Sequence, residues 1–480
     1  MYQKLLFQFL IVMSLTLVYS TNIFAEEDTN NRINALEKQV EELTKALQSV
    51  TEELKELKKP STTNNTISSS DSSVDEKINV LAEEIDNIKQ ATVVEEPTYE
   101  QKYGAAPAAS KVYLTDRGFS FGGYGELLIS QIKENDDDIV DNLRVILYTG
   151  YKFTDKIVFN AEIEFEHGNT GSNLDGKEGS ASVEFALIDF LLADEFNIRG
   201  GLLLTPFGIS NEIHEPTTFY GVNRPAVETQ IIPSTWRESG LGIHGTFDLE
   251  SAGSLSYRAY AMNSVDSRGF KASNNRGLRT KGNRSRLNDV AFVSRVEYDP
   301  IPGLKIGGSV FLGNSGQNER VDNGASAFDG DKIDGFFQMY EADIQFKYAG
   351  FDARSLIVYT KLDDAELINA NNGLEGDASV GEEQLGYYAT LAYNVLSLAN
   401  TGNRYFQYLA PFVKYEYYDT QREVPSGFSR NGANERDEFT FGFNYKPIPN
   451  VVVKAEYQWL DDESNSERNN QFNFGLGYVF

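Results

Sequence analysis

Cysteine is absent from the 480 residues, so disulfides, thiolate catalysis and thiolate metal sites are excluded. Beyond the N-terminus, no run approaches the roughly 18 apolar residues of a transmembrane helix. A membrane protein with this sequence would have to be a closed barrel, because only helices and barrels satisfy their backbone groups in lipid. Basic residues number only 43 against 71 acidic ones, and the net charge of −28 argues against nucleic acid as a partner.

The first segment, residues 1–25, has the features of a signal peptide. Lys4 precedes an apolar core at 5–18, and the small residue Ala25 stands before the acidic Glu26. An uncleaved membrane anchor is the alternative, but the core is short for a helix that spans a membrane. The sequence therefore predicts an exported protein.

A heptad pattern predicts a coiled coil over residues 26–60. Its apolar positions alternate in steps of three and four: Ile33, Leu36, Val40, Leu43, Leu47, Val50, Leu54 and Leu57. A polar linker is expected at 61–73, a shorter coiled coil at 74–90, and a second linker at 91–116. Mixed Ile, Val and Leu at the core positions leave dimers and trimers open, and a single helix packed on another domain is the alternative. This segment follows the signal peptide, which predicts a periplasmic position and a possible contact with the cell wall.

From residue 117 to 480 the apolar period changes to two. The last segment shows it clearly, with one face formed by Phe472, Phe474, Leu476, Tyr478 and Phe480. About sixteen such segments follow one another, joined alternately by short and long connections, as in outer-membrane barrels. We expect an all-β transmembrane barrel of about sixteen antiparallel strands after the α-helical coiled coil; fourteen or eighteen strands remain open.

Two segments resemble a known family. Phe480, with aromatic residues alternating before it, resembles the C-terminal assembly signal of outer-membrane barrels. The stretch 202–245 resembles the third loop of the phosphate-selective porin superfamily, most clearly at Pro206-Phe207-Gly208 and at 233–238 (PSTWRE). The resemblance covers about residues 115 to 480. It implies a sixteen-stranded homotrimer whose third loop folds into the lumen.

Charged residues of this loop and of the inward strand faces are the candidates for permeation. In the loop they are Glu212, Glu215, Arg224, Glu228, Arg237 and Glu238. On the wall they are Arg144, Arg199, Arg258 and Arg295, matched by a similar number of acidic residues that include Glu162 and Glu184. Opposed charges in a narrow wet passage select permeants. The alternatives are a loop that only seals the barrel mouth and cross-strand ion pairs without a role in transport.

The fourth long loop carries a basic group against the acidic background. Its members are Arg268, Lys271, Arg276, Arg279, Lys281, Arg284 and Arg286. They could steer anions toward the mouth, bind lipopolysaccharide phosphates, or form an ordinary solvated loop.

An enzyme is the rival class, and the sequence argues against it. There are three histidines, His167, His214 and His244, and no GxSxG motif. Glu164, Glu166 and His167 could together bind a metal, but strand ends also carry such residues for solvation. We therefore expect no enzymatic activity, no cofactor and no metal site.

The sequence predicts a trimeric outer-membrane porin in contact with lipid and lipopolysaccharide, with its N-terminal segment in the periplasm. It would form a water-filled diffusion channel for small polar or charged solutes. A channel selective for an inorganic anion such as phosphate, or for oligosaccharides, is the alternative; a structural tether or adhesin is a remote one. The permeating solute and the sign of ion selectivity stay open.

Overall fold

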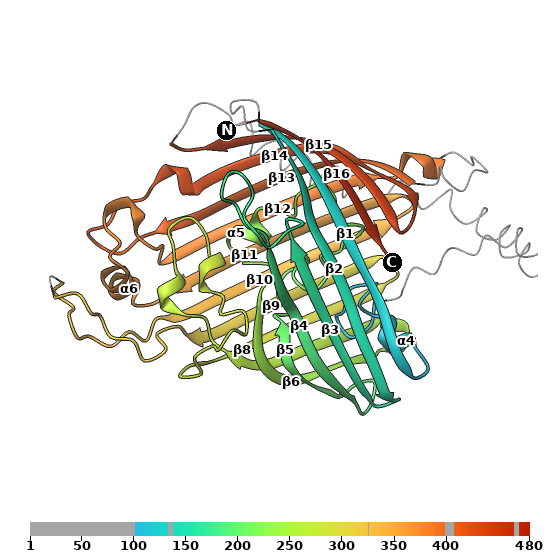
Figure 1. Ribbon diagram of the computed structural model, residues 1–480, viewed down its shortest axis with the longest axis horizontal. Helices are drawn as coiled ribbons and strands as arrows, with labels where there is room; N and C mark the ends of the chain where they lie inside the picture. The colour runs from blue at the N-terminus through green and yellow to red at the C-terminus, as the bar shows by residue number, and fades with distance from the viewer. Residues whose placement is uncertain (1–100, 133–137, 325, 399–407, 465–469) are drawn as a thin grey trace, which may run out of the picture. The chain divides into compact units, whose positions relative to one another are not determined.

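The computed structural model describes residues 101–132, 138–324, 326–398, 408–464 and 470–480 (Figure 1). The predicted signal peptide, both coiled-coil segments and the linker at 61–73 lie outside these residues. Within the described ranges, no helix is long and apolar enough to cross a membrane.

Sixteen antiparallel strands form one closed barrel in which each strand pairs with its neighbours in sequence and β1 pairs with β16. The strands are β1 (Gly118–Ile132), β2 (Ile139–Thr154), β3 (Ile157–Glu166), β4 (Ser180–Leu191), β5 (Asn197–Leu204), β6 (Arg237–Asp248), β7 (Ser254–Asn263), β8 (Val290–Ile301), β9 (Leu304–Asn314), β10 (Phe336–Tyr348), β11 (Phe351–Leu362), β12 (Glu383–Tyr393), β13 (Tyr408–Glu423), β14 (Glu435–Ile448), β15 (Val451–Asp462) and β16 (Gln471–Val479). The prediction of an all-β barrel of sixteen strands is confirmed.

Connections differ in length at the two ends of the barrel. At one end, turns such as 302–303, 349–350 and 449–450 have two residues. At the other end lie long loops, of which three matter below: L3 (205–236), L4 (264–289) and L5 (315–335). Short helices lie outside the strands: α4 (Lys111–Leu114), α5 (Val227–Gln230) in L3 and α6 (Ala365–Asn372). β1 begins and β16 ends at the short-turn end, as an even strand number requires.

The barrel wall has apolar residues on its outer face and polar residues on its inner face, which is the reverse of a globular protein. On β14, Phe439, Phe441 and Phe443 point outward and are 42%, 47% and 41% exposed. The alternate residues Glu438, Thr440 and Asn444 point inward and are buried. An apolar outer surface with a polar interior is the arrangement of a barrel surrounded by lipid.

A linker was predicted at residues 101–116, but these residues lie in the barrel interior and pack against the inner face of the wall. Ala106, Ala108 and Ala109 are almost fully buried. The Ala109 carbonyl accepts a hydrogen bond from Asn160 Nδ2 on β3 at 2.9 Å, and Tyr113 donates to Asp189 Oδ2 on β4 at 2.5 Å. The small alanine side chains allow the backbone of this segment to approach the wall closely. The Ala-rich composition, which is also typical of linkers, therefore permits tight packing here.

Phe480 closes the seam between the first and last strands. Its backbone N–H donates to the Gly123 carbonyl at 2.8 Å, and its own carbonyl accepts from the Gly123 N–H at 2.9 Å. The ring lies 5.9 Å from the Phe121 ring and 6.4 Å from the Tyr478 ring. The terminal residue thus adds a bonded pair to the β1–β16 ladder.

Deleting Phe480 should block insertion, since both seam bonds and the terminal aromatic ring are lost. We expect little heat-modifiable, folded protein in outer-membrane fractions. Phe480→Tyr, which keeps the backbone bonds and an aromatic ring, serves as control and should assemble normally. A normal folded yield of the deletion variant would contradict the prediction.

Candidate functional site

L3 leaves the wall between β5 and β6 and bonds to strands far away in the barrel order (Figure 1). Three strand side chains donate to consecutive L3 carbonyls. Lys446 Nζ bonds Thr217 at 2.8 Å, Arg354 Nη1 bonds Thr218 at 2.6 Å, and Asn444 Nδ2 bonds Phe219 at 3.0 Å. L3 therefore reaches across the lumen to β11 and β14.

Asn211 holds the two ends of L3 together. Its amide Nδ2 donates to the Thr205 carbonyl at 2.6 Å and to the Trp236 carbonyl at 3.0 Å. Its Oδ1 accepts from the Trp236 N–H at 2.6 Å. Trp236 is fully buried, with its ring 4.8 Å from that of Phe311 on β9. This neck fixes where the loop enters the lumen, while the carbonyl bonds fix its tip.

The four predicted acidic residues of L3 and its boundary are all buried and all have polar partners. Their partners are Arg258 Nε for Glu212 at 3.0 Å, Ala108 N for Glu215 at 2.8 Å, Tyr388 Oη for Glu228 at 2.7 Å, and Thr280 N for Glu238 at 2.8 Å. Burial raises the pKa of Glu215 to about 7, although the Ala108 N–H opposes the shift. These carboxylates tie L3 to the wall, to L4 and to the segment before β1.

The inward arginines are paired with carboxylates on the neighbouring strand or on the next strand but one. The pairs are Arg144–Glu126 at 3.0 Å, Arg199–Asp189 at 2.7 Å, Arg237–Glu184 at 2.8 Å, Arg258–Glu297 at 2.7 Å and Arg295–Asp343 at 2.6 Å. Because buried charges are stable only when paired, each contributes to wall structure. Pairing also cancels much of the field that they would project into the lumen.

A group of cations in L3 and L4 lacks such ion pairs. Arg224, Arg276, Arg279 and Lys281, here called the basic cluster, form no ion pair within 4.0 Å among the residues that the structure describes. Arg276 Nη1 donates to the Ser234 carbonyl at 3.0 Å, and Arg279 Nη1 donates to the Pro233 and Thr235 carbonyls at 3.0 Å each. L4 thus holds its cations against the neck of L3.

The members of the basic cluster repel one another. Burial and the charge of Arg224 lower the pKa of Arg276, and burial with the charges of Arg276 and Arg237 lowers that of Arg279. Burial and the Arg279 charge likewise lower the pKa of Lys281. Glu166 and Glu184 act on these cations, but none of the four is in an ion pair with a carboxylate that the structure describes, and their combined charge produces a positive potential at this site.

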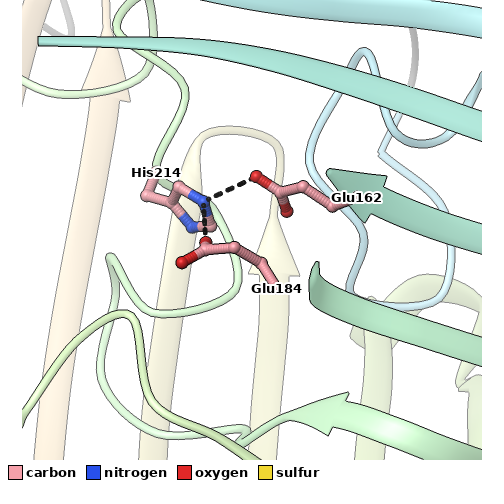
Figure 2. Close-up of side chains that lie close together, drawn as sticks. All are labelled: Glu162, Glu184 and His214. Carbon is pink, nitrogen blue, oxygen red and sulfur yellow. Dashed lines mark hydrogen bonds and ion pairs between the residues drawn. The ribbon is translucent and has the colours of Figure 1, made fainter. Parts of the chain in front are cut away.

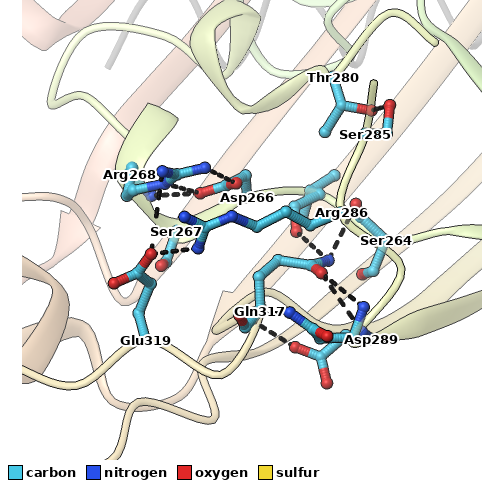
Figure 3. Close-up of polar contacts among 12 residues, drawn as sticks. Ser264, Asp266, Ser267, Arg268, Thr280, Ser285, Arg286, Asp289, Gln317 and Glu319 are labelled. Carbon is cyan, nitrogen blue, oxygen red and sulfur yellow. Dashed lines mark hydrogen bonds and ion pairs between the residues drawn. The ribbon is translucent and has the colours of Figure 1, made fainter. Parts of the chain in front are cut away.

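Two other L4 cations, Arg268 and Arg286, are paired with carboxylates, as Figure 3 shows. Arg268 Nη2 lies 2.6 Å from Asp266 Oδ2, and Arg286 bonds Glu319 of L5. Gln317 of L5 accepts from the Asn288 N–H at 3.1 Å. L4 and L5 therefore form one polar network, and its arginines serve as matched comparisons for the basic cluster.

A histidine site that the sequence did not predict lies where L3 meets β3 and β4 (Figure 2). His214 Nε2 faces Glu162 Oε1 at 3.3 Å and Glu184 Oε2 at 3.4 Å, and all three residues are buried. His167, the histidine considered from the sequence, instead bonds Asp141 Oδ2 at 2.7 Å on the exposed strand end. Strand alternation already placed Glu162 and Glu184 inward; only the path of L3 brings His214 to them.

Comparison with known proteins supplies a relative from Aquifex aeolicus (strain VF5). That protein, described only as an uncharacterized protein, is 37% identical over 398 residues, which are 81% of this chain and 86% of the relative. The chain belongs to the family of this Aquifex protein. No family model matches it.

Solved structures with some likeness are outer-membrane proteins. They include OmpF of Salmonella typhi in complex with daunomycin (12% identity, 76% of this chain and 98% of that one, TM-score 0.48). Another is the outer-membrane channel DcaP of Acinetobacter baumannii (12% identity, 75% and 97%, TM-score 0.47). A third is OpdK of Pseudomonas aeruginosa (10% identity, 75% and 98%, TM-score 0.41).

Proposed function

We propose that this protein is an outer-membrane porin that forms a diffusion channel for small polar or charged solutes. The observation that carries the proposal is the closed barrel of sixteen strands with an apolar outer face and a charged inner face. A barrel of about sixteen strands is wide enough to enclose an aqueous passage. Phe439 and Glu438, adjacent on β14, represent the two environments that such a wall separates.

L3 is the constriction of this channel. This part of the proposal is supported by the bonds of L3 to the opposite wall, where β11 and β14 hold the carbonyls of Thr217, Thr218 and Phe219. Arg295 on the wall and Glu228 in the loop itself are almost fully buried. A lumen so filled leaves a narrow passage, in which fixed charges act strongly on permeants.

A preference for anions is the second candidate, and the basic cluster favours it. The chain as a whole carries a net charge of −28, yet Arg224, Arg276, Arg279 and Lys281 stand together without paired carboxylates. Wall arginines such as Arg144 and Arg199 are neutralised and contribute less. The cluster would concentrate small inorganic anions at the neck of L3.

The proposed assembly is a homotrimer with its N-terminal segment in the periplasm. The heptads predicted at 26–60 permit trimers, which is compatible with a trimeric barrel. An oligosaccharide channel and a structural tether are the competing functions. Single-channel recording of the purified protein in a planar bilayer under a salt gradient separates a channel from a tether. Ion-conducting steps with a defined reversal potential support a channel, and their absence supports the tether.

Shortening L3 should raise conductance. Replacing 216–227 by a two-residue Gly-Ser link removes the tip that reaches β11 and β14 but keeps the Asn211 neck. We expect single-channel conductance to rise about twofold or more, because the passage widens. Removing 322–330 from L5, which includes bonds to its own loop and to residues 370 and 371, is the control and should leave conductance unchanged. An unchanged conductance after the L3 deletion would show that the loop does not constrict the channel.

Reversing charge in the basic cluster should shift ion selectivity toward cations. Arg279→Glu changes an uncompensated charge, whereas Arg268→Glu changes one already paired with Asp266. The reversal potential in a tenfold salt gradient should move clearly for Arg279→Glu and less for Arg268→Glu. The difference should shrink as salt is raised, since the Debye length falls from about 10 Å at 0.1 M to about 3 Å at 1 M. Equal shifts for both variants would remove the cluster from the selectivity mechanism.

The native mass in detergent tests the assembly. We expect the mass of three chains plus bound detergent by light scattering, and a trimer that survives Leu43→Asp in the predicted heptads. The barrel contacts should be sufficient to keep the three copies together in that variant. A native monomer or dimer for the wild type would contradict the trimer.

A further inference from the structure

Three segments converge on the imidazole of His214. Glu162 comes from β3, Glu184 from β4 and His214 from L3, and both carboxylates face the same ring nitrogen (Figure 2). The three ligand atoms lie within 4.8 Å of one another. Each side chain is at most 1% exposed, so the group is shielded from bulk water.

The two distances from His214 Nε2 are long for a histidine that donates a charge-assisted hydrogen bond. A charge-assisted N–H···O⁻ bond measures about 2.7–2.9 Å, and one N–H points at one acceptor. Here the Nε2 atom lies 3.3 Å from one carboxylate oxygen and 3.4 Å from another. Tetrahedral ligands bound at about 2.0–2.1 Å are separated by about 3.3–3.4 Å. Both nitrogen–oxygen distances equal the separation expected of two ligands of one ion.

The other ring nitrogen supports this geometry. Nδ1 lies 3.0 Å from the Asn211 carbonyl, which accepts only from a protonated nitrogen. In a neutral imidazole this bond places the lone pair on Nε2, toward both carboxylates. Metal-binding histidines usually donate their second nitrogen to a carbonyl or carboxylate in this way.

Two oxygens of these carboxylates form no hydrogen bond that the described residues show. They are Glu162 Oε2 and Glu184 Oε2, and the second is the oxygen that lies 3.4 Å from His214 Nε2. Glu184 Oε1, in contrast, accepts from Arg237 Nη1 at 2.8 Å and from Thr235 Oγ1 at 2.5 Å. Unpaired buried carboxylate oxygens are costly, and a cation offsets that cost.

A β-bulge brings the second carboxylate into place. In the β3–β4 ladder, Glu162 pairs with Phe185 and Ile163 pairs with Val183, so that Glu184 is the extra residue. Glu184 and Phe185 are consequently both buried rather than alternating. Bulges commonly re-aim a side chain toward a site.

We propose that Glu162, Glu184 and His214 bind a divalent first-row transition ion, with Zn²⁺ as the best fit to one nitrogen and two oxygen ligands. The ion neutralises two buried carboxylates and joins L3 to the wall. Through the Asn211 carbonyl it is coupled to the neck where both ends of the loop meet. Its role is structural, and it does not depend on what passes through the channel.

Metal content of the full-length protein, purified in detergent without chelator, tests the site directly. We expect about one Zn²⁺ per chain by mass spectrometry of the elements. Treatment with EDTA should lower the thermal midpoint, and added Zn²⁺ should restore it. Co²⁺ in place of Zn²⁺ should give visible d–d absorption typical of low coordination number.

His214→Gln should reduce bound metal about tenfold or more. His244→Gln is the matched control, because His244 is also buried but contacts one carboxylate, Asp189, at 3.2 Å. The control should keep its metal and its response to EDTA. Heat-modifiable mobility on a gel confirms that each variant is folded, and where His214→Gln fails to fold, the Co²⁺ spectrum of the wild type decides.

A wild-type protein that contains no metal, and that neither Zn²⁺ nor Co²⁺ binds or stabilises after EDTA treatment, would overturn the proposal. The cluster would then be an imidazolium held between two carboxylates. Equal metal content in His214→Gln and wild type would overturn it as well. Conductance enters none of these measurements, so failure of the metal site and failure of the porin function remain distinguishable.

Discussion

Closure of the backbone ladder between β1 and β16 is the constraint on which the rest of this structure depends. Lipid supplies no hydrogen-bond partners, so an open edge in the membrane would leave a row of unpaired amides and carbonyls. The nine register pairs from Tyr124–Val479 to Ile132–Gln471, with the bonded pair Gly123–Phe480 beyond them, remove that edge. Once the sheet is closed, every strand must present one face to lipid and the other to the lumen, and the side chains of β14 follow that division.

Closure also turns the interior into a polar core. The volume inside the wall is occupied by L3, by parts of L4, and by residues 101–116, all of which carry backbone groups that need partners. Lys446, Arg354 and Asn444 supply these from the wall to the L3 carbonyls. Most of the wall arginines are held in ion pairs, because an isolated buried charge would be too costly. Against these paired arginines, the four cations of the basic cluster add positive potential at one position.

L3 is held at both its tip and its neck, and this explains how a loop of this length keeps one path. Bonds at Thr217 and Phe219 position the tip, and Asn211 joins the two ends. His214 links the neck to Glu162 and Glu184 on the wall, at the bulge in the β3–β4 ladder. Since L4 donates to the Pro233, Ser234 and Thr235 carbonyls, the basic cluster and the neck of L3 form one continuous unit.

The sequence by itself determined the barrel, because a period of two and the alternation of short and long connections are local properties of the chain. Alternation from Phe472 to Phe480 predicts the last strand, and the same pattern assigns Glu162, Glu184 and the arginines to the inner face. Tertiary structure alone decided which of these groups meet. His214 lies 52 positions from Glu162, and Asn444 lies 225 positions from Phe219, so neither contact leaves a periodic trace in sequence. The packing of residues 101–116 could not be predicted for a similar reason. An Ala-rich segment is compatible with a solvated linker and with close contact to a wall, and only the surface that it meets decides between these two states.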